Sequence, residues 1–508
     1  MPNAVQFKRI SPEAVGIPSS SLAAFIGALE ERAHPLDGVQ GFMLLRHGQV
    51  AAEGWWAPYG SQSPHTMYSL SKSFTSTAIG LAVAEGRLTV DDPVLKFFPD
   101  DAPANPSANL QAMCVRHLLA MNTGHAEDTT QRVFWGRSNL PADNNTDPNW
   151  PRKFLSLPVE REPGSWFVYN TAATYMLSAI ITQLTGETLL DYLRPRLFEP
   201  LGIENPTWES DPRGINLGGT GLHIKLEDIA RFGQMYLQGG MWDGKQVVPA
   251  AWVAEATVAH SDNSNTPSTP DWASGYGYQF WRCRPNAYRG DGAFGQYCIV
   301  MPEQDAVLAM ISGVRDMQVV LDKVWAHLLP AMGPQPLPAD PAGHNVLRTR
   351  LANLTLPLVP GVPAPVAAAQ WSGKVYAFAD NPLQIQSVML DFAGEDSRLT
   401  VTDARGTRAF TAGCCNWLPG TGARLGAYDM HGVEPAAEPL AACGDWTAAG
   451  PNGGTFEMRI CYYESELAHI LRFHFAGNDL RLEFAPNVAW DEPKVTMIAG
   501  HASERVRG

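Results

Sequence analysis

The spacing of hydrophobic residues changes once along the chain, at a stretch rich in proline and small residues. Before this stretch, helical spacing and short extended runs are mixed. After it, short runs of alternating hydrophobic and polar residues are separated by Gly, Asn and Asp turns, a pattern typical of antiparallel β structure. We therefore predict an amino-terminal domain over residues 1–332, a Pro-rich linker over 333–365, and an antiparallel barrel or sandwich over 366–508.

The first domain has helical and extended patterns at both of its ends. Residues 19–33 have helical spacing behind serines that can cap a helix, and residues 41–56 predict two strands joined by a turn. Residues 296–313 predict a strand hairpin, and 317–332 an amphipathic helix. Between about residues 70 and 270 the pattern is mainly helical. This order predicts an α/β domain of the α+β type, in which one antiparallel sheet is assembled from distant segments, is flanked by helices and carries a helical insertion.

Composition and charge narrow the class of partner. At 508 residues, with 45% hydrophobic and 17% charged residues, the chain is long enough for two or more domains with full cores. Its net charge of -14 opposes a general attraction to nucleic acids or to anionic membranes. We expect a small molecule or a peptide as the partner, no nucleic acid and no membrane. The sequence leaves the oligomeric state open.

The amino terminus lacks the apolar core of a secretory signal, and no apolar run is long enough to span a bilayer. This favours a cytoplasmic location, unless a leader has been removed. The seven cysteines are scattered without a CxxC pair, and the acidic pairs have no histidine at metal-ligand spacing. We therefore expect neither a metal nor another cofactor.

The stretch HTMYSLSKSFTSTAIGLAVAEG (65–86) places Ser69 three residues before Lys72, where a loop passes into an apolar helix. Residues three apart lie on one helix face, so the Lys72 amine can reach the Ser69 hydroxyl. Burial beside the positive end of a helix would lower the pKa of the lysine enough for it to act as a base. The alternative is a serine that caps the helix and a lysine that is exposed to solvent.

The longer run MYSLSKSFTSTAIGLAVAEGRLTVDDPVLKFFP resembles the nucleophile segment of serine hydrolases related to class C β-lactamases and penicillin-binding proteins. The resemblance covers about residues 10–330 and includes three motifs in the order of the family. It implies a β-lactamase/DD-peptidase-like fold, in which Ser69 is the nucleophile and Lys72 its partner.

The second motif lies in PGSWFVYNTAATYMLSAIITQLTG (163–186), where the resemblance assigns proton transfer to Tyr169. A Pro-Gly turn and a short extended run precede a helix, so Tyr169 is expected where a loop meets that helix. The usual family order is Tyr-x-Asn, whereas this chain has Tyr169-Asn170-Thr171. This order is similar to the Tyr-Asn-Ser form of carboxylesterases and nylon-oligomer hydrolases, and it makes Asn170 and Thr171 candidate substrate-binding residues.

The third motif, in YRGDGAFGQYCIVMPEQDAVLAMISG (288–313), has Gly290-Asp291-Gly292 where relatives have Lys-Thr-Gly or His-x-Gly. We expect these residues to bind substrate, because the glycines would let a substrate lie along the backbone. The missing cation at Gly290 favours a neutral substrate over a carboxylate, and Arg289 is the candidate substitute. A turn before an edge strand is the alternative.

The resemblance also indicates an oxyanion hole formed by the backbone amides of Ser69 and Ala293. His125 follows a segment similar to the family's LLTHTSGL and is a candidate for lining the pocket, although a capping or surface role is equally compatible with its position. His223 is expected to be structural. Four aromatic residues could form a wall of the site or pack in the core: Trp135, Trp150, Trp281 and Tyr288.

The sequence therefore predicts an enzyme, a serine hydrolase that forms an acyl-enzyme on Ser69 and cleaves a small ester, amide or short or unusual peptide. Lys72 and Tyr169 would relay the proton, with the pKa of the phenol lowered by a neighbouring ammonium. One alternative is a penicillin-recognising binding or sensor protein that acylates but turns over slowly, or a β-lactamase or D-aminopeptidase activity. Another is a non-enzymatic scaffold whose function lies in the β domain.

Overall fold

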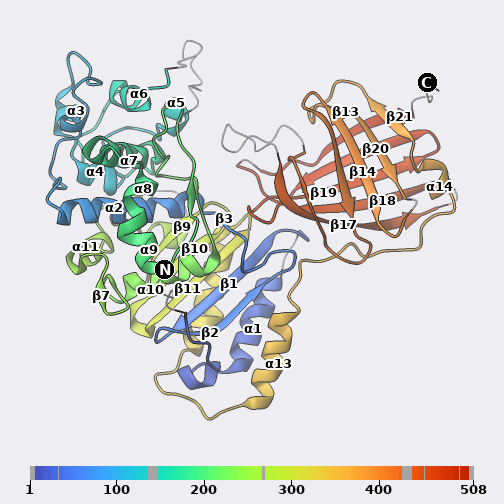
Figure 1. Cartoon of the computed structure of the whole chain (residues 1–508), viewed down its shortest axis with the longest axis horizontal. Helices are drawn as coiled ribbons and strands as arrows, with labels where there is room; N and C mark the ends of the chain where they lie inside the picture. Colours follow the sequence, from blue (N-terminus) through green and yellow to red (C-terminus); the bar gives the residue numbers. More distant parts are fainter. Residues whose placement is uncertain are drawn as a thin grey trace.

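The computed structural model has two large parts, an α/β domain and a β-barrel, joined by a segment that runs over the surface of the α/β domain (Figure 1). It describes residues 6–31, 34–134, 147–265, 269–392, 394–425, 437–450, 452–490 and 492–502.

A six-stranded antiparallel sheet forms the centre of the α/β domain. Its middle strands come from opposite ends of the domain, because β1 pairs with β11, with Phe42 opposite Met310. The hairpin expected over 296–313 is present as β10 and β11. The spatial order is β2 (Gln49–Trp55), β1 (Gly38–Arg46), β11 (Ala306–Gly313), β10 (Gln296–Met301), β9 (Tyr288–Gly292) and β8 (Trp281–Arg282). The predicted sheet of distant segments is thus confirmed.

Successive side chains of β1 enter two different hydrophobic cores, one on each face of the sheet. Phe42 and Leu44 belong to one core, and Met43 and Leu45 to the other, as the period-two alternation of a strand requires. One core includes residues of α1 (Ser19–Glu30) and α12 (Met317–Lys323), and the other those of α2 (Ser71–Ala84) and α10 (Leu226–Leu237). Because both faces are covered, the sheet is a rigid base for the residues at its edges.

The segment between β2 and β8 is mainly helical, as expected, and α2 packs against α7 at its centre. Its further helices are α3 (Ala108–Ala112), α4 (Val115–Leu119), α5 (Thr130–Phe134), α6 (Trp150–Ser156), α7 (Thr171–Thr185), α8 (Leu189–Leu193), α9 (Glu199–Leu201) and α11 (Ala250–Ala256). Five short strands accompany them: β3 (His65–Thr66), β4 (Thr207–Trp208), β5 (Leu222–Ile224), β6 (Met241–Trp242) and β7 (Lys245–Gln246). Since β3 pairs with β5, the start of α2 is tied to the loop that follows α9.

The connection between the two parts contains a docked helix. Helix α13 (Pro341–Ala352) packs against α1 and β2, and Arg350 donates hydrogen bonds to the Ala23 carbonyl and the Glu30 carboxylate. The sequence predicts only a Pro-rich linker over 333–365. Leu347 is the one buried residue of this helix, so its hydrophobic pattern is too weak to predict it.

The carboxy-terminal part is a ten-stranded antiparallel sheet curled into a nearly closed barrel, in which the edge strands β15 and β16 contact each other. Its interior is a packed core, where Trp371 stacks on Phe475 and both contact Trp446. The prediction of a barrel or sandwich is thus confirmed as a barrel. After α14 (Ala368–Trp371) its strands are β12 (Val375–Phe378), β13 (Ile385–Asp391), β14 (Ser397–Asp403), β15 (Gly406–Ala412), β16 (Leu418–Gly422), β17 (Glu438–Ala449), β18 (Gly453–Cys461), β19 (Ala468–Ala476), β20 (Asp479–Pro486) and β21 (Thr496–Ala502).

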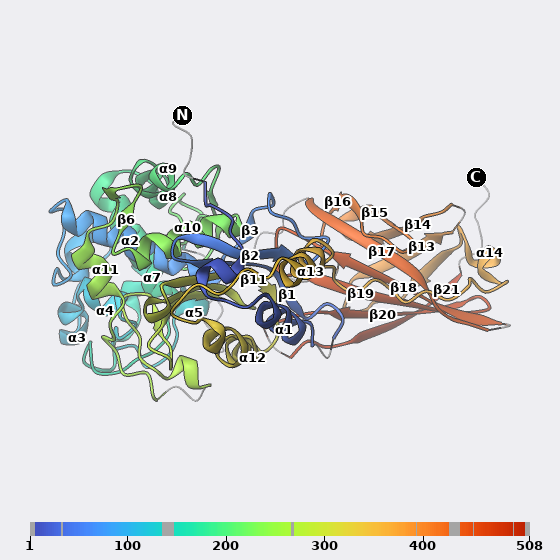
Figure 2. The same ribbon diagram turned by 90° about the horizontal axis from the view of Figure 1, so that it is seen from below.

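The barrel contacts the α/β domain near the start of β1 and the end of β11, and Figure 2 shows its strands extending away from that side of the domain. Asn487 donates to the carbonyl of Glu466 at 2.8 Å, and Gln40 of β1 donates to the same carbonyl at 3.2 Å. Arg315, just after β11, donates to the Asn487 carbonyl at 2.6 Å. Hydrogen bonds through side chains and backbone therefore join the two parts.

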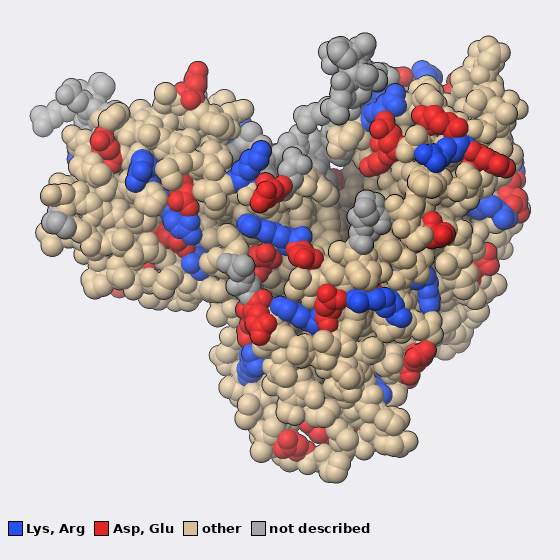
Figure 3. Space-filling model, turned by 180° about the vertical axis from the view of Figure 1, so that it is seen from behind, with Lys and Arg blue, Asp and Glu red and all other residues tan. Residues whose placement is uncertain are grey.

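Basic and acidic side chains are interleaved on the face of the molecule shown in Figure 3, so that face presents no extended field of one sign. Among the described residues, no helix has the length and apolar character needed to cross a membrane.

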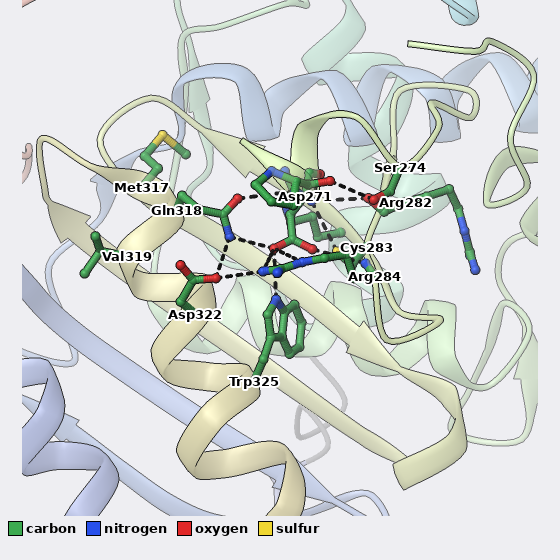
Figure 4. Close-up of polar contacts among 12 residues, drawn as sticks. Asp271, Ser274, Arg282, Cys283, Arg284, Met317, Gln318, Val319, Asp322 and Trp325 are labelled. Carbon is green, nitrogen blue, oxygen red and sulfur yellow. Dashed lines mark hydrogen bonds and ion pairs between the residues drawn. The ribbon is translucent and has the colours of Figure 1, made fainter. Parts of the chain in front are cut away.

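A buried carboxylate ties the loop before β8 to α12 and the turn after it (Figure 4). Asp271 accepts hydrogen bonds from Arg284 and Gln318, each at 2.7 Å, and from Trp325 at 3.0 Å. Burial alone would raise the pKa of Asp271, but these donors lower it to about 2. The carboxylate is therefore charged, and its hydrogen bonds fix the loop that leads into β8 and β9.

We expect Asp271→Asn to lower the free energy of unfolding by about 2–4 kcal/mol at pH 7, because a buried charged acceptor is lost. The folded-state pKa lies below the unfolded one, so this stabilisation is complete above about pH 4 and disappears as the pH falls towards 2. Urea unfolding at several pH values measures it. Asp322→Asn is the control, because Asp322 is more than half exposed and should contribute below about 1 kcal/mol; equal losses for both variants would contradict the account.

Candidate active site

Ser69 lies where an otherwise buried segment opens to solvent. After β3 the chain forms a single 3-10 turn over Tyr68–Leu70 and continues directly as α2. From His65 to Ala82 every residue is buried except Ser69. No side-chain hydrogen bond caps the start of α2, so the Ser69 hydroxyl does not serve as a helix cap.

The Lys72 amine has three polar neighbours and is 1% exposed. Its Nζ lies 2.9 Å from Ser69 Oγ, 3.0 Å from Thr171 Oγ1 and 2.7 Å from the carbonyl oxygen of Gly219. The carbonyl can only accept a hydrogen bond, and the Thr171 hydroxyl can accept another. A neutral amine has two N–H groups and one lone pair, so these two acceptors leave the lone pair facing Ser69.

Burial determines the charge of this amine. Removal from water disfavours the ammonium form and lowers the pKa of Lys72 to about 7, although Asp128 and Asp291 act in the opposite direction. Near neutral pH the Lys72 amine is therefore uncharged in a large fraction of the molecules, which is the condition for accepting a proton from Ser69. The buried position also excludes the alternative of a solvent-exposed lysine.

Tyr169 is in contact with both Ser69 and Lys72. Its hydroxyl is hydrogen-bonded to Ser69, and Lys72 Nζ lies 4.9 Å from the centre of its ring. Stacking on Trp281 and an edge contact with Tyr276 fix the ring. Burial raises the pKa of Tyr169 well above its ordinary value, opposite to the direction expected from the sequence. The phenol therefore stays protonated, and it can pass a proton on only while receiving another.

Two glycines allow β9 to pass very close to the turn that contains Ser69 (Tyr68–Leu70), called the nucleophile turn below. A Cβ added to Gly292 would lie 2.1 Å from the Met67 carbonyl oxygen, and one added to Gly290 would lie 2.5 Å from Ser73 Oγ. No side chain fits at Gly292, where the neighbour is backbone, and at Gly290 the side chains of Leu70 and Ser73 would have to shift. Gly292 therefore lets two backbone segments come together, and substrate binding along residues 290–292 remains a prediction.

Two backbone donors flank this close approach, because Ala293 follows Gly292 and Ser69 lies two residues after Met67. Among the described residues, neither the amide of Ser69 nor that of Ala293 donates a hydrogen bond to the protein. The peptide before Ala293 is fixed by a turn in which the Gly295 amide donates to the Gly292 carbonyl at 3.1 Å. Free and fixed N–H groups beside the nucleophile are what an oxyanion hole requires.

Comparisons with known proteins concern this same domain. A family model described as beta-lactamase matches residues 29–324, more than half of the 508 residues. The chain belongs to the β-lactamase family. This membership places the protein among serine hydrolases and confirms the expectation of an enzyme.

Relatives in the β-lactamase family differ in the activity for which they are named. The 6-aminohexanoate-dimer hydrolase of Paenarthrobacter ureafaciens is 27% identical over 310 residues, covering 58% of this chain and 78% of the relative. Esterase EstB of Burkholderia gladioli is 24% identical over 213 residues, covering 39% of this chain and 54% of the relative. A candidate 6-aminohexanoate-dimer hydrolase from Bacillus anthracis shares the fold, with a TM-score of 0.52 at 20% identity, over 66% of this chain and 89% of that one.

The two residues after Tyr169 have different roles in this β-lactamase-family site. Asn170 is fully buried, and its Oδ1 accepts from the Ala172 amide at 3.1 Å and from Thr129 Oγ1 at 3.0 Å. Asn170 is therefore the N-cap of α7, and these bonds hold its side chain inside the protein. Thr171, one residue later, is the one that contacts Lys72.

Arg289 does not provide a free cation for a substrate carboxylate, the role for which it was the candidate. Its guanidinium is fully buried, donates to Asp291 at 2.8 Å and to the Asp271 carbonyl at 2.8 Å, and lies 4.3 Å from the centre of the Trp272 ring. Asp291 is 5% exposed and is paired with this arginine. The pair is enclosed because residues 289 and 291 lie on the face of β9 opposite to Gly290.

His125 is buried beside Thr123, with Nδ1 2.8 Å from Oγ1, and its ring contacts Phe154. Burial lowers the pKa of His125 to about 4, so the ring is neutral at physiological pH. Its described contacts do not include Ser69, Lys72 or Tyr169. A substrate contact by His125 thus remains a prediction.

Only part of the expected aromatic wall lies at the site. Trp281 stacks on Tyr169, whereas Trp150 packs on Phe134 and Tyr288 packs on Phe280 in the core. Trp135 lies outside the described residues. His223, on β5, contacts the Glu209 carboxylate at 3.2 Å.

The carbonyl of Gly219 is a site group that the sequence did not single out. It lies in the run NLGGTG (216–221), whose cluster of glycines was the available signal.

In the described parts of the chain, the one group of side chains close enough to share a metal ion is Cys414, Cys415 and Asp445, on the barrel. It involves none of the residues around Ser69.

The pKa of Lys72 predicts how activity depends on pH. If the neutral amine acts as the base, the specificity constant for an uncharged ester should rise with pH and level off above an apparent pKa of about 7. Initial rates between pH 5.5 and 9 measure this profile. Labelling of Ser69 by a fluorophosphonate, a probe that does not ionise, should follow the same curve; a rate that is flat down to pH 5.5 would contradict this role for Lys72.

Proposed function

We propose that this protein hydrolyses a small neutral ester or amide, including the amide bond of a short peptide, through an acyl-enzyme on Ser69. The observation that carries the proposal is the buried Lys72 amine, whose two N–H groups are taken up by Thr171 and Gly219 so that its lone pair faces Ser69 Oγ. A base of this kind, next to the one solvent-accessible serine of the segment, is suited to activating that serine.

In the acylation step Ser69 Oγ attacks the substrate carbonyl carbon while its proton passes to Lys72 Nζ. The negative charge on the carbonyl oxygen is stabilised by the amides of Ser69 and Ala293. When the tetrahedral intermediate collapses, the bond to the leaving group breaks. The proton then moves from the lysine through the Tyr169 hydroxyl, which gives one proton to the leaving group as it takes up another.

In the second step a water molecule attacks the acyl carbon. Its proton passes through Tyr169 to Lys72 and from there to Ser69 Oγ as the bond between the acyl carbon and Ser69 Oγ breaks, which releases the acid and restores the serine hydroxyl. No redox change and no further reactant besides water is needed. The high pKa of Tyr169 suits this role, because a neutral phenol both donates and accepts.

The preference for neutral substrates follows from the charges around Ser69. Arg289 is held by Asp291, and a side chain at Gly290 would collide with Ser73, so neither position supplies a cation to a substrate carboxylate. Two relatives are named as a 6-aminohexanoate-dimer hydrolase and an esterase, which supports amide and ester bonds as the substrate class.

We expect a fluorophosphonate probe to modify Ser69, and Ser69→Ala to reduce ester turnover on the order of 10⁶-fold, because the nucleophile is lost. Peptide mapping and initial-rate assays are the measurements. Ser76→Ala is the matched control, since Ser76 is a buried serine on the same helix. One equivalent of product without further turnover would instead indicate a slowly deacylating binding protein.

A pair of substrates that differ in one charge tests specificity. The methyl ester of p-nitrophenyl succinate should have a specificity constant roughly 10-fold or more above that of the free acid, because a carboxylate would be desolvated without a cation partner. The two compounds carry the same leaving group, so the ratio reports the acyl side alone. A preference for the free acid would mean that a cation reaches the site.

A further inference from the structure

The residue before the nucleophile is held by the barrel. Tyr68 has a φ of 46°, in the left-handed region that a non-glycine residue rarely adopts, and its side chain is buried. Its hydroxyl donates to Glu466 Oε1 at 2.5 Å. Glu466 lies in the turn between β18 and β19 and is fully buried.

The residue after Ala293, the second oxyanion donor, also has a left-handed φ and a buried side chain. Phe294 follows Ala293, has a φ of 63° and is buried. Its ring lies 5.6 Å from that of Tyr68 and 5.3 Å from that of Trp490, which follows β20 of the barrel. The rings of Trp490 and Tyr68 are 5.8 Å apart. Tyr68 and Phe294 pack with the hydrophobic core of the barrel and not with the two cores of the α/β domain.

Each amide of the oxyanion hole is therefore next to a residue in an unfavourable backbone conformation. Such conformations persist only where the surroundings impose them. At Tyr68 and Phe294 an important part of these surroundings is supplied by the barrel, through Glu466 and Trp490. A third contact also holds the segment before Ser69 against the barrel. The amide of Thr66 donates to the carbonyl of Glu464 at 3.0 Å.

We propose that the barrel is a working part of the active site, in which Glu466 and Trp490 position the oxyanion hole by holding Tyr68 and Phe294. Glu466 is thus a positioning residue that acts through Tyr68. Neither Glu466 nor Trp490 needs to touch the substrate. This inference rests on the proposed function, because it concerns how the transition state of acylation on Ser69 is stabilised.

The test compares Tyr68→Phe, Glu466→Leu and Glu466→Gln with the wild-type enzyme, using a neutral p-nitrophenyl ester. Tyr68→Phe and Glu466→Leu should each lower kcat by roughly 10- to 100-fold, as expected for donors displaced from the transition state. KM should change by less than about threefold, because ground-state contacts are unaffected. Glu466→Gln keeps an acceptor for the Tyr68 hydroxyl and should restore most of kcat.

Two further variants separate positioning from a loss of stability. Arg315→Leu removes another hydrogen bond between the α/β domain and the barrel, away from the nucleophile turn, and should lower the unfolding temperature with kcat unchanged. The double variant Tyr68→Phe with Glu466→Leu should be no slower than the slower single variant, since both remove one interaction.

The proposal fails if Tyr68→Phe and Glu466→Leu have kcat within twofold of wild type while their unfolding temperature falls as in Arg315→Leu. If Glu466→Leu does not fold, Tyr68→Phe decides the question, because it removes a single oxygen atom. Absence of both turnover and Ser69 labelling in the wild-type protein is a different result, which would overturn the proposed function and this inference with it.

Discussion

The Lys72 amine lies in a place from which water is almost excluded, and its three polar neighbours come from three different segments. Ser69 is in the turn before α2, Thr171 begins α7, and Gly219 lies in the loop before β5. Side chains of the two helices fix that loop, since Thr75 of α2 donates to the Gly218 carbonyl and Ser178 of α7 to the Asn216 carbonyl. The packing of α2 on α7 therefore determines both the position and the pKa of the Lys72 amine.

The two amides of the proposed oxyanion hole depend on an unusually close approach of backbone to backbone. At Gly292 the strand β9 passes against the Met67 carbonyl with no room for a Cβ. The same approach places the Ala293 amide beside the nucleophile turn, where it has no partner in the described structure. Two donors without partners are costly in a folded protein unless they serve a ligand. In the proposed reaction their cost is offset when negative charge develops on the substrate oxygen.

Electrostatics around the site follow from one enclosed pair. Arg289 and Asp291 form a buried ion pair, and the guanidinium also contacts the Asp271 carbonyl, the Cys283 sulfur and the Trp272 ring. Because an arginine in this position cannot turn outward without leaving Asp291 buried and unpaired, its guanidinium stays enclosed beside the strand. The hydrogen bonds that Arg284 and Gln318 donate to the Asp271 carboxylate then fix the loop that leads into β8.

The sequence by itself determined the features that depend on near neighbours. The hairpin of β10 and β11, the start of α7 just after Tyr169 and the contact between Ser69 and Lys72 all arise within a few residues, so local spacing and side-chain type predict them. Helix α13 was missed because its apolar pattern is weak. Only the tertiary structure decided which of Asn170 and Thr171 contacts the lysine, that Arg289 is enclosed, and that burial lowers the pKa of Lys72 while raising that of Tyr169. Tyr68 and Glu466 are 398 positions apart, and such contacts are set by how whole domains pack, which the pattern of residues along the chain does not encode locally.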